Sequence, residues 1–201
     1  TPFAYDSTLK SKLSLPFIDA VFPTANKAGL IKTDNEIHGI ILKGVDKDYN
    51  WNYINSNLTL GNIPQYTDDE RSNDVVISQI IADKLLLNVG DDVRIWFVGE
   101  DMKTRGRKFS VKGIYETGLT ECDERFIYCD LNQIRRLNGW ENDYVGHLEI
   151  QLNEDVDVLE ANNYIYYSIP TYLISYTARE LYPHIFDWLD LLDLNVLIIL
   201  T

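Results

Sequence analysis

The sequence has few of the residues that bind metals or form covalent cross-links. Its 201 residues include two cysteines, Cys122 and Cys129, and three histidines, His38, His147 and His184. A zinc site needs about four ligands, and these side chains show no ligand spacing, so we predict no metal and no cofactor. A disulfide would require the chain to fold back between the two cysteines. We therefore expect two free thiols, with Cys129 inside the fold and Cys122 near its surface.

The sequence is also poor in basic residues. It contains 18 Lys and Arg against 31 Asp and Glu, which gives a formal net charge of −13. Nucleic-acid binding requires a basic stripe, so this balance argues against a nucleic-acid partner. It also argues against a general attraction to anionic lipid headgroups. The simplest interpretation is that the net charge keeps the domain soluble.

Long apolar runs are missing as well. The final run begins at Leu194, is interrupted by Asn195, and is far shorter than the roughly 20 residues that span a bilayer. What the sequence does contain is material for a core, since 45% of its residues are hydrophobic and 12% are aromatic. These fractions exclude a disordered tail and predict one or two folded domains.

Residues 108–129 have the pattern of two short strands joined by a turn. Apolar residues roughly alternate with polar ones over 108–115, as in a half-buried strand, and Gly118 ends this run. Residues 120–124 are short, polar and acidic, which predicts an exposed turn. Residues 125–129 predict the second strand.

Capping residues predict two helices. Asp130 is the expected N-cap of a helix over 131–137, with Gly139 as its stop. Ser78 is the expected N-cap of a second helix over 79–86. Further strands are expected over 28–33, 36–43, 74–78, 93–98, 144–152 and 172–175, further helices over 155–167 and 180–193, a hairpin turn at 33–35 and a loop over 58–67.

Several of these segments resemble a known family. The phrases V-x-G-I-Y at 111–115, D-E-R-F-I-Y-C-D at 123–130 and L-x-Q-I-x-x-L at 131–137 closely resemble the extracytoplasmic domain of FtsX-like ABC-transporter permeases. That family includes the MacB-like and lipoprotein-releasing permeases, and the phrases are most similar to versions found in Bacteroidetes. I-S-x-x-I-A-x-x-L-x-x-x-V-G-D-x-V at 77–93 resembles the family's strongest phrase, with Gly90 supplying the backbone freedom for the helix stop. The resemblance covers nearly the whole chain and includes no catalytic fingerprint.

The resemblance implies an α+β fold with two lobes. A β-α-β membrane-proximal lobe would comprise residues 1–73 and 131–181, and a small, mostly β lobe of residues 74–130 would be inserted into it. The strands over 93–129 would form a strongly bent sheet in that inserted lobe. Residues 182–201 would form a C-terminal helix leading into a truncated transmembrane span.

The resemblance also implies a location. The chain begins with Thr1 rather than Met, and we expect it to be a piece of a longer protein. A first transmembrane helix would precede the polar residues 1–12, and a second would begin near Leu194, although a buried terminal helix is the alternative for that run. The whole protein would lie in the inner membrane, with this domain in the periplasm.

Residues 99–107 are expected to form a short, charged hairpin tip. In lipoprotein-releasing relatives, the corresponding connection is a longer, hook-like loop that binds a lipoprotein chaperone. Here the connection is short and contains no proline, so that docking mode does not carry over directly. The tip is either a solvated hairpin or a partner-contact loop. In the second case the contact residues would be Glu100, Asp101, Met102, Lys103, Thr104 and Arg105.

The function implied by the resemblance is non-catalytic. The domain would couple cytoplasmic ATP hydrolysis to the movement or release of a substrate such as a lipoprotein. Its partners would be an ABC ATPase subunit, reached through membrane and cytoplasmic parts, with a second permease subunit and a lipoprotein or other periplasmic protein as further candidates; no nucleic acid is expected.

Two alternatives belong to other functional classes. One is a freestanding extracytoplasmic binding module, which a gene without membrane spans would favour. The other is a carboxylate-dependent hydrolase, because paired carboxylates can carry out acid–base chemistry. Its candidate residues are Glu116, Glu121, Asp123 and Glu124.

Overall fold

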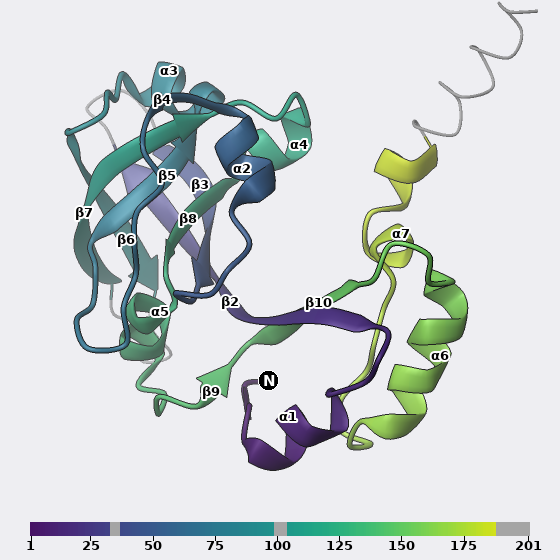
Figure 1. The fold of residues 1–201 in the computed structure, drawn as a ribbon. Coiled ribbons are helices and arrows are strands. Elements are labelled where there is room, and N and C mark those ends of the chain that lie inside the picture. Colours follow the sequence, from purple (N-terminus) through teal and green to yellow (C-terminus); the bar gives the residue numbers. More distant parts are fainter. Residues whose placement is uncertain (33–36, 99–103, 188–201) are drawn as a thin grey trace, which may run out of the picture. The chain divides into compact units, whose positions relative to one another are not determined.

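The chain folds into a mixture of strands and helices, which confirms the predicted α+β class (Figure 1). The structure is a computed structural model and describes residues 1–32, 37–98 and 104–187. The described strands are β1 (Phe3–Ala4), β2 (Ile18–Lys32), β3 (Ile37–Val45), β4 (Leu58–Gly61), β5 (Asp74–Ser78), β6 (Asp92–Val98), β7 (Thr104–Tyr115), β8 (Phe126–Asp130), β9 (Tyr144–Val145) and β10 (His147–Leu152). The described helices are α1 (Ser7–Lys12), α2 (Asn52–Ser56), α3 (Gln79–Leu85), α4 (Thr120–Asp123), α5 (Leu131–Asn138), α6 (Val158–Ser168) and α7 (Ala178–Leu181).

Six of these strands pair in a closed ring. β2 pairs with β3, β3 with β8, β8 with β5, β5 with β7, β7 with β6, and β6 again with β2. The hydrogen-bonding path therefore returns to its start and forms a β-barrel, called the barrel below. Two further strands extend the sheet beyond this ring: β4 pairs with β7, and β10 pairs with β2. Closure leaves few unpaired strand edges, which rigidifies the sheet and protects it from edge-to-edge association.

The barrel consists of two three-stranded halves with narrow junctions between them. In one half, β3 pairs with β2 along the whole length of β3, and it also pairs with the whole of β8. In the other half, β7 pairs with the whole of β5 and of β6. The halves meet at a single pair, Val76 with Tyr128, and at two pairs between β2 and β6, Leu30 with Trp96 and Ile31 with Ile95.

The interior of the barrel is apolar. Ile95 and Phe97 of β6 are fully buried and lie in one cluster with Phe109 of β7 and Leu42 of β3. Other members of this cluster come from helices that pack against the strands: Ile81, Ala82, Leu85, Leu131, Ile134 and Leu137.

Helix α5 packs so closely on β3 that only glycine fits at position 44. A Cβ atom placed on Gly44 would lie 2.9 Å from the Cα atom of Leu131 and 2.8 Å from a side-chain carbon of Ile134. Since the first of these neighbours is backbone, it cannot rotate away. The close approach fixes α5 against the barrel.

The predicted helix caps are confirmed. The side chain of Ser78 accepts a hydrogen bond from the Ile81 amide at 3.1 Å, and that of Asp130 accepts one from the Asn132 amide at 2.8 Å. Gly139 ends α5 in the left-handed region, at φ 67°. The stop of α3 differs from the prediction, because Leu86 itself takes the left-handed conformation, at φ 55°.

Several local predictions are wrong. Residues 58–61, predicted as loop, form β4, because they find an open side of β7 with which to pair. Residues 172–175, predicted as a strand, are not in a strand. The predicted strand over 144–152 is interrupted at Gly146. The backbone is close to Ala25 at this point, since a Cβ atom placed on Gly146 would lie 3.1 Å from the Cα atom of Ala25. The turn predicted at 33–35 lies outside the described residues.

The chain divides into two compact units. Unit 1 comprises Thr1–Tyr5 and Phe22–Glu149 and contains the barrel; unit 2 comprises Asp6–Val21 and Ile150–Thr201. The predicted lobe boundaries, with 74–130 inserted between 1–73 and 131–181, do not coincide with this division. β5, β6 and β7 of the predicted insert do form one half of the barrel, but β8 pairs with β3 in the other half. The prediction of a separate sheet over 93–129 is therefore wrong, because the parallel alignment of β8 with β3 places Ile127 in the same core as Leu42.

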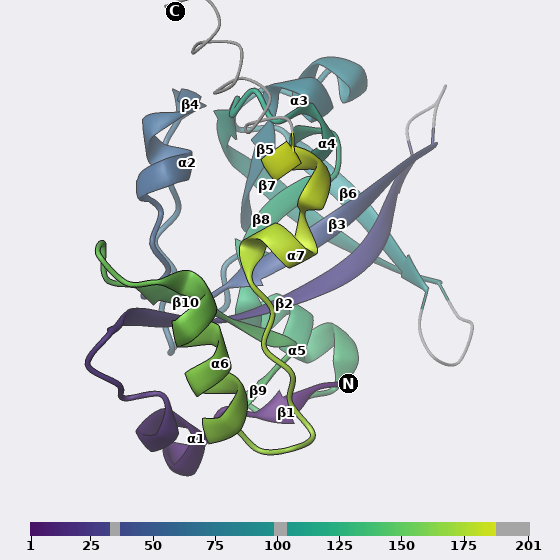
Figure 2. The same cartoon turned by 90° about the vertical axis from the view of Figure 1, so that its right-hand side faces the viewer.

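Unit 2 is built from short contacts between its two chain segments. Lys12 at the end of α1 donates a hydrogen bond to the Ser168 carbonyl at the end of α6, at 3.0 Å. The rings of Phe17 and Tyr164 pack edge to face, with centroids 5.6 Å apart. Figure 2 shows α1 beside α6. In the described part of unit 2, the buried apolar side chains are Leu9, Leu13, Ala161 and Ile165.

The C-terminal part of unit 2 begins as a capped helix. Thr177 and Glu180 form a reciprocal capping box at the start of α7. The helix predicted over 180–193 is interrupted at Tyr182, just before Pro183, and residues 183–187 are helical. The rest of that prediction, including the span expected from Leu194, lies outside the described residues. Within 1–32, 37–98 and 104–187, no helix combines the length and hydropathy needed to cross a membrane.

Candidate interaction surface

Strands β6 and β7 form the hairpin that the sequence predicts. Their last pair is Val98 with Thr104, so residues 99–103 make the connection. Thr104 and Arg105 are described; both lie on β7 and are exposed. The other predicted contact residues, Glu100, Asp101, Met102 and Lys103, lie outside the described residues. A partner-contact role for this tip stays a prediction.

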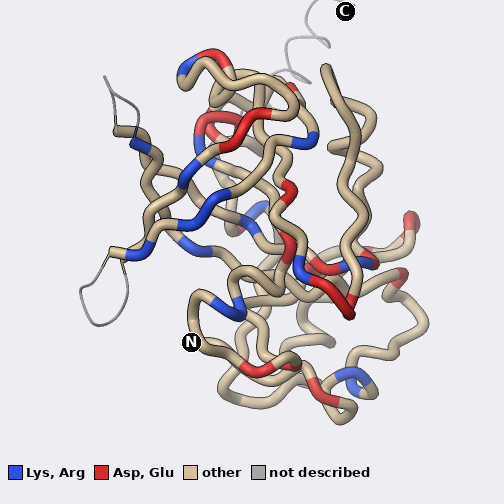
Figure 3. Tube along the Cα trace, turned by 90° about the vertical axis from the view of Figure 1, so that its left-hand side faces the viewer, with Lys and Arg blue, Asp and Glu red and all other residues tan. Residues whose placement is uncertain are grey.

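Basic residues are concentrated on the same hairpin, although the chain as a whole is acidic. In Figure 3, blue segments gather along the strands that lead to the two grey loops. Along the described strands β6 and β7, the one acidic residue is Asp92, whose carboxylate lies 2.7 Å from the ammonium of Lys108. The basic residues of these two strands are Arg94, Arg105, Arg107, Lys108 and Lys112.

A tryptophan lies in the middle of this basic surface. Because Ile95 and Phe97 point into the barrel, Trp96 between them lies on the outer face. Its ring covers Gly106 on β7, where a Cβ atom would come within 2.9 Å of it. The guanidinium carbon of Arg94 lies 5.8 Å from the Trp96 ring centroid. Arg94, Trp96, Gly106 and Lys108 are called the β6–β7 face below.

The composition of the β6–β7 face is that of an interaction surface. Leu30 of β2, which pairs with Trp96, is 43% exposed and extends the apolar centre. Tryptophan and arginine are the residues most enriched at the centres of protein interfaces. Arg107 is not part of this face, because it pairs with Ile95, which points into the barrel; its Nε is buried and has no acceptor among the residues that the structure describes.

A polar cavity of about 620 Å³ opens beside the start of the same hairpin. It lies between the segment around Arg71 and the strand residues Asp92 and Lys108, with Phe109 as an apolar contribution. Charged groups of both signs line it, and two of them already pair with each other. The cavity therefore offers polar contacts but no concentrated charge of one sign.

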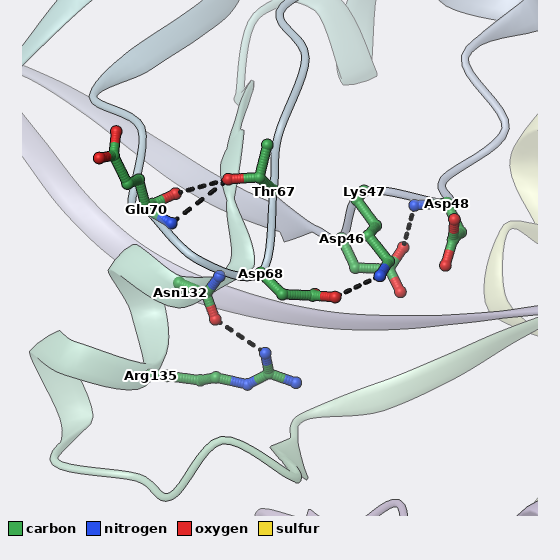
Figure 4. A network of polar contacts seen from close by, with 8 residues as sticks. All are labelled: Asp46, Lys47, Asp48, Thr67, Asp68, Glu70, Asn132 and Arg135. Carbon is green, nitrogen blue, oxygen red and sulfur yellow. Dashed lines mark hydrogen bonds and ion pairs between the residues drawn. The ribbon is translucent and has the colours of Figure 1, made fainter.

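A second polar group lies where β3 ends and the chain approaches α5 (Figure 4). Lys47 forms an ion pair with Asp68, and the Asp46 carboxylate accepts a hydrogen bond from the Asp48 amide at 3.2 Å. Arg135 of α5 donates to the Asn132 side chain at 2.9 Å and to a backbone carbonyl, that of Tyr144, at 3.0 Å. Of these interactions, the bond from Arg135 to the Tyr144 carbonyl joins α5 to the segment that follows it, and the Lys47–Asp68 pair joins two loops.

Burial makes Asp46 an unusual carboxylate. Its pKa is raised from 3.8 to about 6, first by desolvation and then by the nearby Asp48, and Arg135 opposes this increase. Desolvation also raises the pKa of Asp130, against hydrogen bonds from the Asn132 and Ser72 amides that lower it. Neither carboxylate belongs to a group that could hold a metal, since the described part of the chain contains no cluster of three or more His, Cys, Asp or Glu with that geometry.

Of the four carboxylates considered for hydrolysis, Asp123 alone is buried. Glu116, Glu121 and Glu124 are exposed. Asp123 is 1% exposed, which corrects the prediction of an exposed turn over 120–124. Its oxygens accept hydrogen bonds from the Thr117 amide at 3.0 Å, the Thr117 hydroxyl at 2.7 Å and the Gly118 amide at 3.2 Å. This carboxylate is used to hold the loop after β7.

The two cysteines and His147 are the remaining side chains that could take part in chemistry. Cys129 is buried and Cys122 is half-buried, as predicted, and both thiols are free; desolvation raises the pKa of each. His147 lies 3.9 Å from Glu149, which in turn pairs with Lys43 at 2.6 Å. Burial lowers the pKa of His147, so its imidazole favours the neutral form.

Comparison with known proteins agrees with the fold. A family model for the MacB-like periplasmic core domain matches residues 2–165. The extracellular domain of the noncanonic ABC-type transporter YknZ from Gram-positive bacteria has a similar structure, with a TM-score of 0.56 and 16% identity over 83% of this chain and 81% of that one. The periplasmic region of MacB from Actinobacillus actinomycetemcomitans gives a TM-score of 0.52 and 15% identity over 80% of this chain and 70% of that one. Among curated proteins, no sequence matches the chain.

Proposed function

The chain belongs to the family of MacB-like periplasmic core domains, and from this premise we propose that it couples ATP hydrolysis in the cytoplasm to movement of a substrate outside the inner membrane. The domain itself would be the non-catalytic, periplasmic part of an ABC-transporter permease, and hydrolysis would take place on a separate subunit or domain. The observation that carries the proposal is the family match, which extends over residues 2–165.

A mechanical role requires a body that does not deform under load. The barrel supports this role, because its strands surround a continuous apolar core. Coupling would then be a rigid-body rearrangement that nucleotide state biases. The substrate would be a lipoprotein or another hydrophobic molecule.

Contact with a partner would use the β6–β7 hairpin. Its half-buried Trp96 and flanking basic residues fit a periplasmic protein with a complementary acidic surface. The residues of the tip, including Thr104 and Arg105, would add contacts at the end of that surface. A second permease subunit is the other candidate partner.

Chemical labelling of the whole permease in native membranes, together with its ATPase, tests the coupling. Val98 at the end of β6 is 56% exposed, so Val98→Cys provides a reporter thiol once Cys122 is replaced by serine; Cys129 is buried and stays silent. The rate of reaction with a membrane-impermeant maleimide is measured without nucleotide, with ATP, and with ATP and vanadate. We expect the rate to differ at least twofold between these states.

The matched control for this experiment is the same variant assembled with an inactive ATPase subunit. Under the proposal, its labelling rate is independent of added ATP. Equal rates in all nucleotide states, while the active complex hydrolyses ATP, would show that this domain does not follow the hydrolysis cycle.

The alternative is a freestanding extracytoplasmic binding module, whose ligand site would be the polar cavity beside Arg71. The hydropathy of the whole gene product separates the two. A permease shows one membrane span before Thr1, one beginning near Leu194 and two more beyond it. A binding module shows none. The hydrolase alternative receives no support from the geometry, because Asp123 is committed to hydrogen bonds with its own loop.

A further inference from the structure

Exposed apolar and aromatic side chains are concentrated in one segment of unit 2. Tyr167 is 84% exposed and Tyr172 is 71% exposed, values that are high for large aromatic rings. A single exposed tyrosine needs no explanation, but a dense group marks a surface that another phase or molecule covers. The group comprises Val158, Leu159, Tyr164, Tyr166, Tyr167, Tyr172, Ile174, Tyr176, Leu181 and Tyr182; we call it the tyrosine surface.

Local structure turns these side chains outward. Helix α6 buries only Ala161 and Ile165, so most of its circumference is left in solvent. After α6 the chain makes a turn in which the Leu173 amide donates to the Pro170 carbonyl at 2.9 Å. Exposure then alternates: Tyr172, Ile174 and Tyr176 are exposed, and the residues between them are half-buried. A row of large side chains with period two therefore faces away from unit 2.

The middle of this segment carries no charge, and Glu160, Arg179 and Glu180 lie near its two ends. Residues 161–178 contain no Asp, Glu, Lys or Arg, although 24% of the whole chain is charged. Residues 49–67 of unit 1 are also uncharged, but there the reason is burial, since Ile54 and Tyr66 are in the interior. Burial does not explain residues 161–178, since six of their large side chains are exposed: Tyr164, Tyr166, Tyr167, Tyr172, Ile174 and Tyr176.

The chemistry of the tyrosine surface fits the headgroup layer of a bilayer. Tyrosine has an apolar ring and a polar hydroxyl, and it is enriched where membranes meet water. Lys12, the kind of basic residue that commonly accompanies such rings, is hydrogen-bonded at the end of α6. The acidic residues near α6, Glu154 to Glu160, lie at its opposite end.

Chain length places a bilayer within reach under the proposed function. Seven residue steps separate Asp187, the last described residue, from Leu194, where the apolar run begins. At no more than about 3.6 Å per residue, these steps span at most roughly 25 Å. If the run enters the membrane, the tyrosine surface lies within a few nanometres of the lipid.

We propose that the tyrosine surface rests in the headgroup layer of the bilayer and seats unit 2 on the membrane. This inference rests on the proposed function. Because residues 161–178 are uncharged and the chain is acidic, the attraction is to neutral or zwitterionic lipid and depends little on salt. The surface would limit tilting of unit 2 on the membrane.

Flotation with phosphatidylcholine vesicles tests this seat. The 201-residue chain is used with Ile198→Asp and Ile199→Asp, so that the C-terminal apolar run does not itself insert. We expect this background protein to float with the vesicles at both 0.1 M and 1 M salt. Adding Tyr166→Ser, Tyr167→Ser and Tyr176→Ser is expected to lower the bound fraction at least threefold.

The matched control substitutes the two exposed apolar residues of the other uncharged segment. Tyr53 and Leu60 are 56% and 55% exposed, and Tyr53→Ser with Leu60→Ser is expected to leave flotation unchanged. All the substituted residues are exposed, so the circular dichroism spectrum and the thermal unfolding curve of each variant should match those of the background protein. An unchanged bound fraction in the triple tyrosine variant, or no flotation of the background protein, overturns the proposal.

The tyrosine surface could instead bind a second copy of the chain. Sedimentation of the same proteins without lipid distinguishes this case from membrane binding. If the chain self-associates and the triple tyrosine variant does not, the surface joins two copies and the membrane seat is wrong. Failure here is distinguishable from failure of the proposed function. If labelling at Val98→Cys depends on nucleotide but the protein does not float with vesicles, only the membrane contact of the tyrosine surface is refuted. If the protein floats but labelling does not depend on nucleotide, only the coupling is refuted.

Discussion

Replacement of Asp46 by asparagine should stabilise the protein at neutral pH. The carboxylate lies in the polar group between β3 and α5, and burial raises its pKa from 3.8 to about 6. In the unfolded chain the group returns to its ordinary value. The folded state therefore binds the proton more tightly, and the stability that the protonated form provides is lost as pH rises through 6.

The magnitude follows from the two pKa values. One pKa unit corresponds to about 1.4 kcal/mol, so the full difference corresponds to about 3 kcal/mol. Asp46 is only half-buried, and water screens the unfavourable charge, which reduces the expected cost to about 1–1.5 kcal/mol. Asparagine keeps the oxygen that accepts from the Asp48 amide, so Asp46→Asn removes the charge and retains the hydrogen bond.

Urea unfolding followed by tryptophan fluorescence measures the effect. At pH 7.5, Asp46→Asn should raise the free energy of unfolding by about 1–1.5 kcal/mol, and roughly half of that gain should disappear at pH 5. Asp48→Asn is the control, because that neighbour is exposed; its gain should be smaller and should vary less with pH. A destabilised Asp46→Asn protein, or a gain that is the same at both pH values, would refute the assigned desolvation of Asp46.

Three further predictions concern packing and buried polar groups. Asp123→Ala should cost about 2–3 kcal/mol, because three donors lose their buried acceptor, whereas Glu121→Ala should change the urea midpoint little. Gly44→Ala should cost about 1–3 kcal/mol in thermal unfolding, because its Cβ meets the backbone of α5; Gly39→Ala, whose nearest neighbour is a side chain at 4.0 Å, should be nearly neutral. Cys129 should react with a thiol reagent only after unfolding, since burial excludes the reagent and raises its pKa.

The sequence predicted those parts of the fold that depend on local chemistry. Ser78 and Asp130 were predictable as N-caps because a cap needs only a short polar side chain just before an apolar helix. Closure of the barrel was not predictable in the same way. Leu30 and Trp96 lie 66 positions apart, and no pattern along the chain states which two distant strands will pair. The strand predicted over 172–175 failed for a related reason, because alternation was present but no neighbouring strand was.

The candidate surface was predicted in part. The hairpin could be found from its charged, glycine-flanked connection, whereas the outer face around Trp96 resembles any solvent-facing row of a strand until Arg94 and Gly106 are seen around the ring. Alternation of Arg94 and Trp96 with buried residues was the available signal. Asp123 was predicted to be exposed because it lies in an acidic turn, and only the structure shows that Thr117 and Gly118 fold back to meet it.

The narrow junctions of the barrel have a consequence for how it opens. Long ladders hold β2, β3 and β8 together, and likewise β5, β7 and β6. Among the described strands, the pairs between the two halves are Val76 with Tyr128 and a two-residue stretch of β2 and β6. Amide hydrogens at these junctions should exchange with solvent before those inside either half of the barrel. Leu30 belongs to one half and Trp96 to the other, so a ligand that contacts both residues would hold β2 against β6 and slow that exchange.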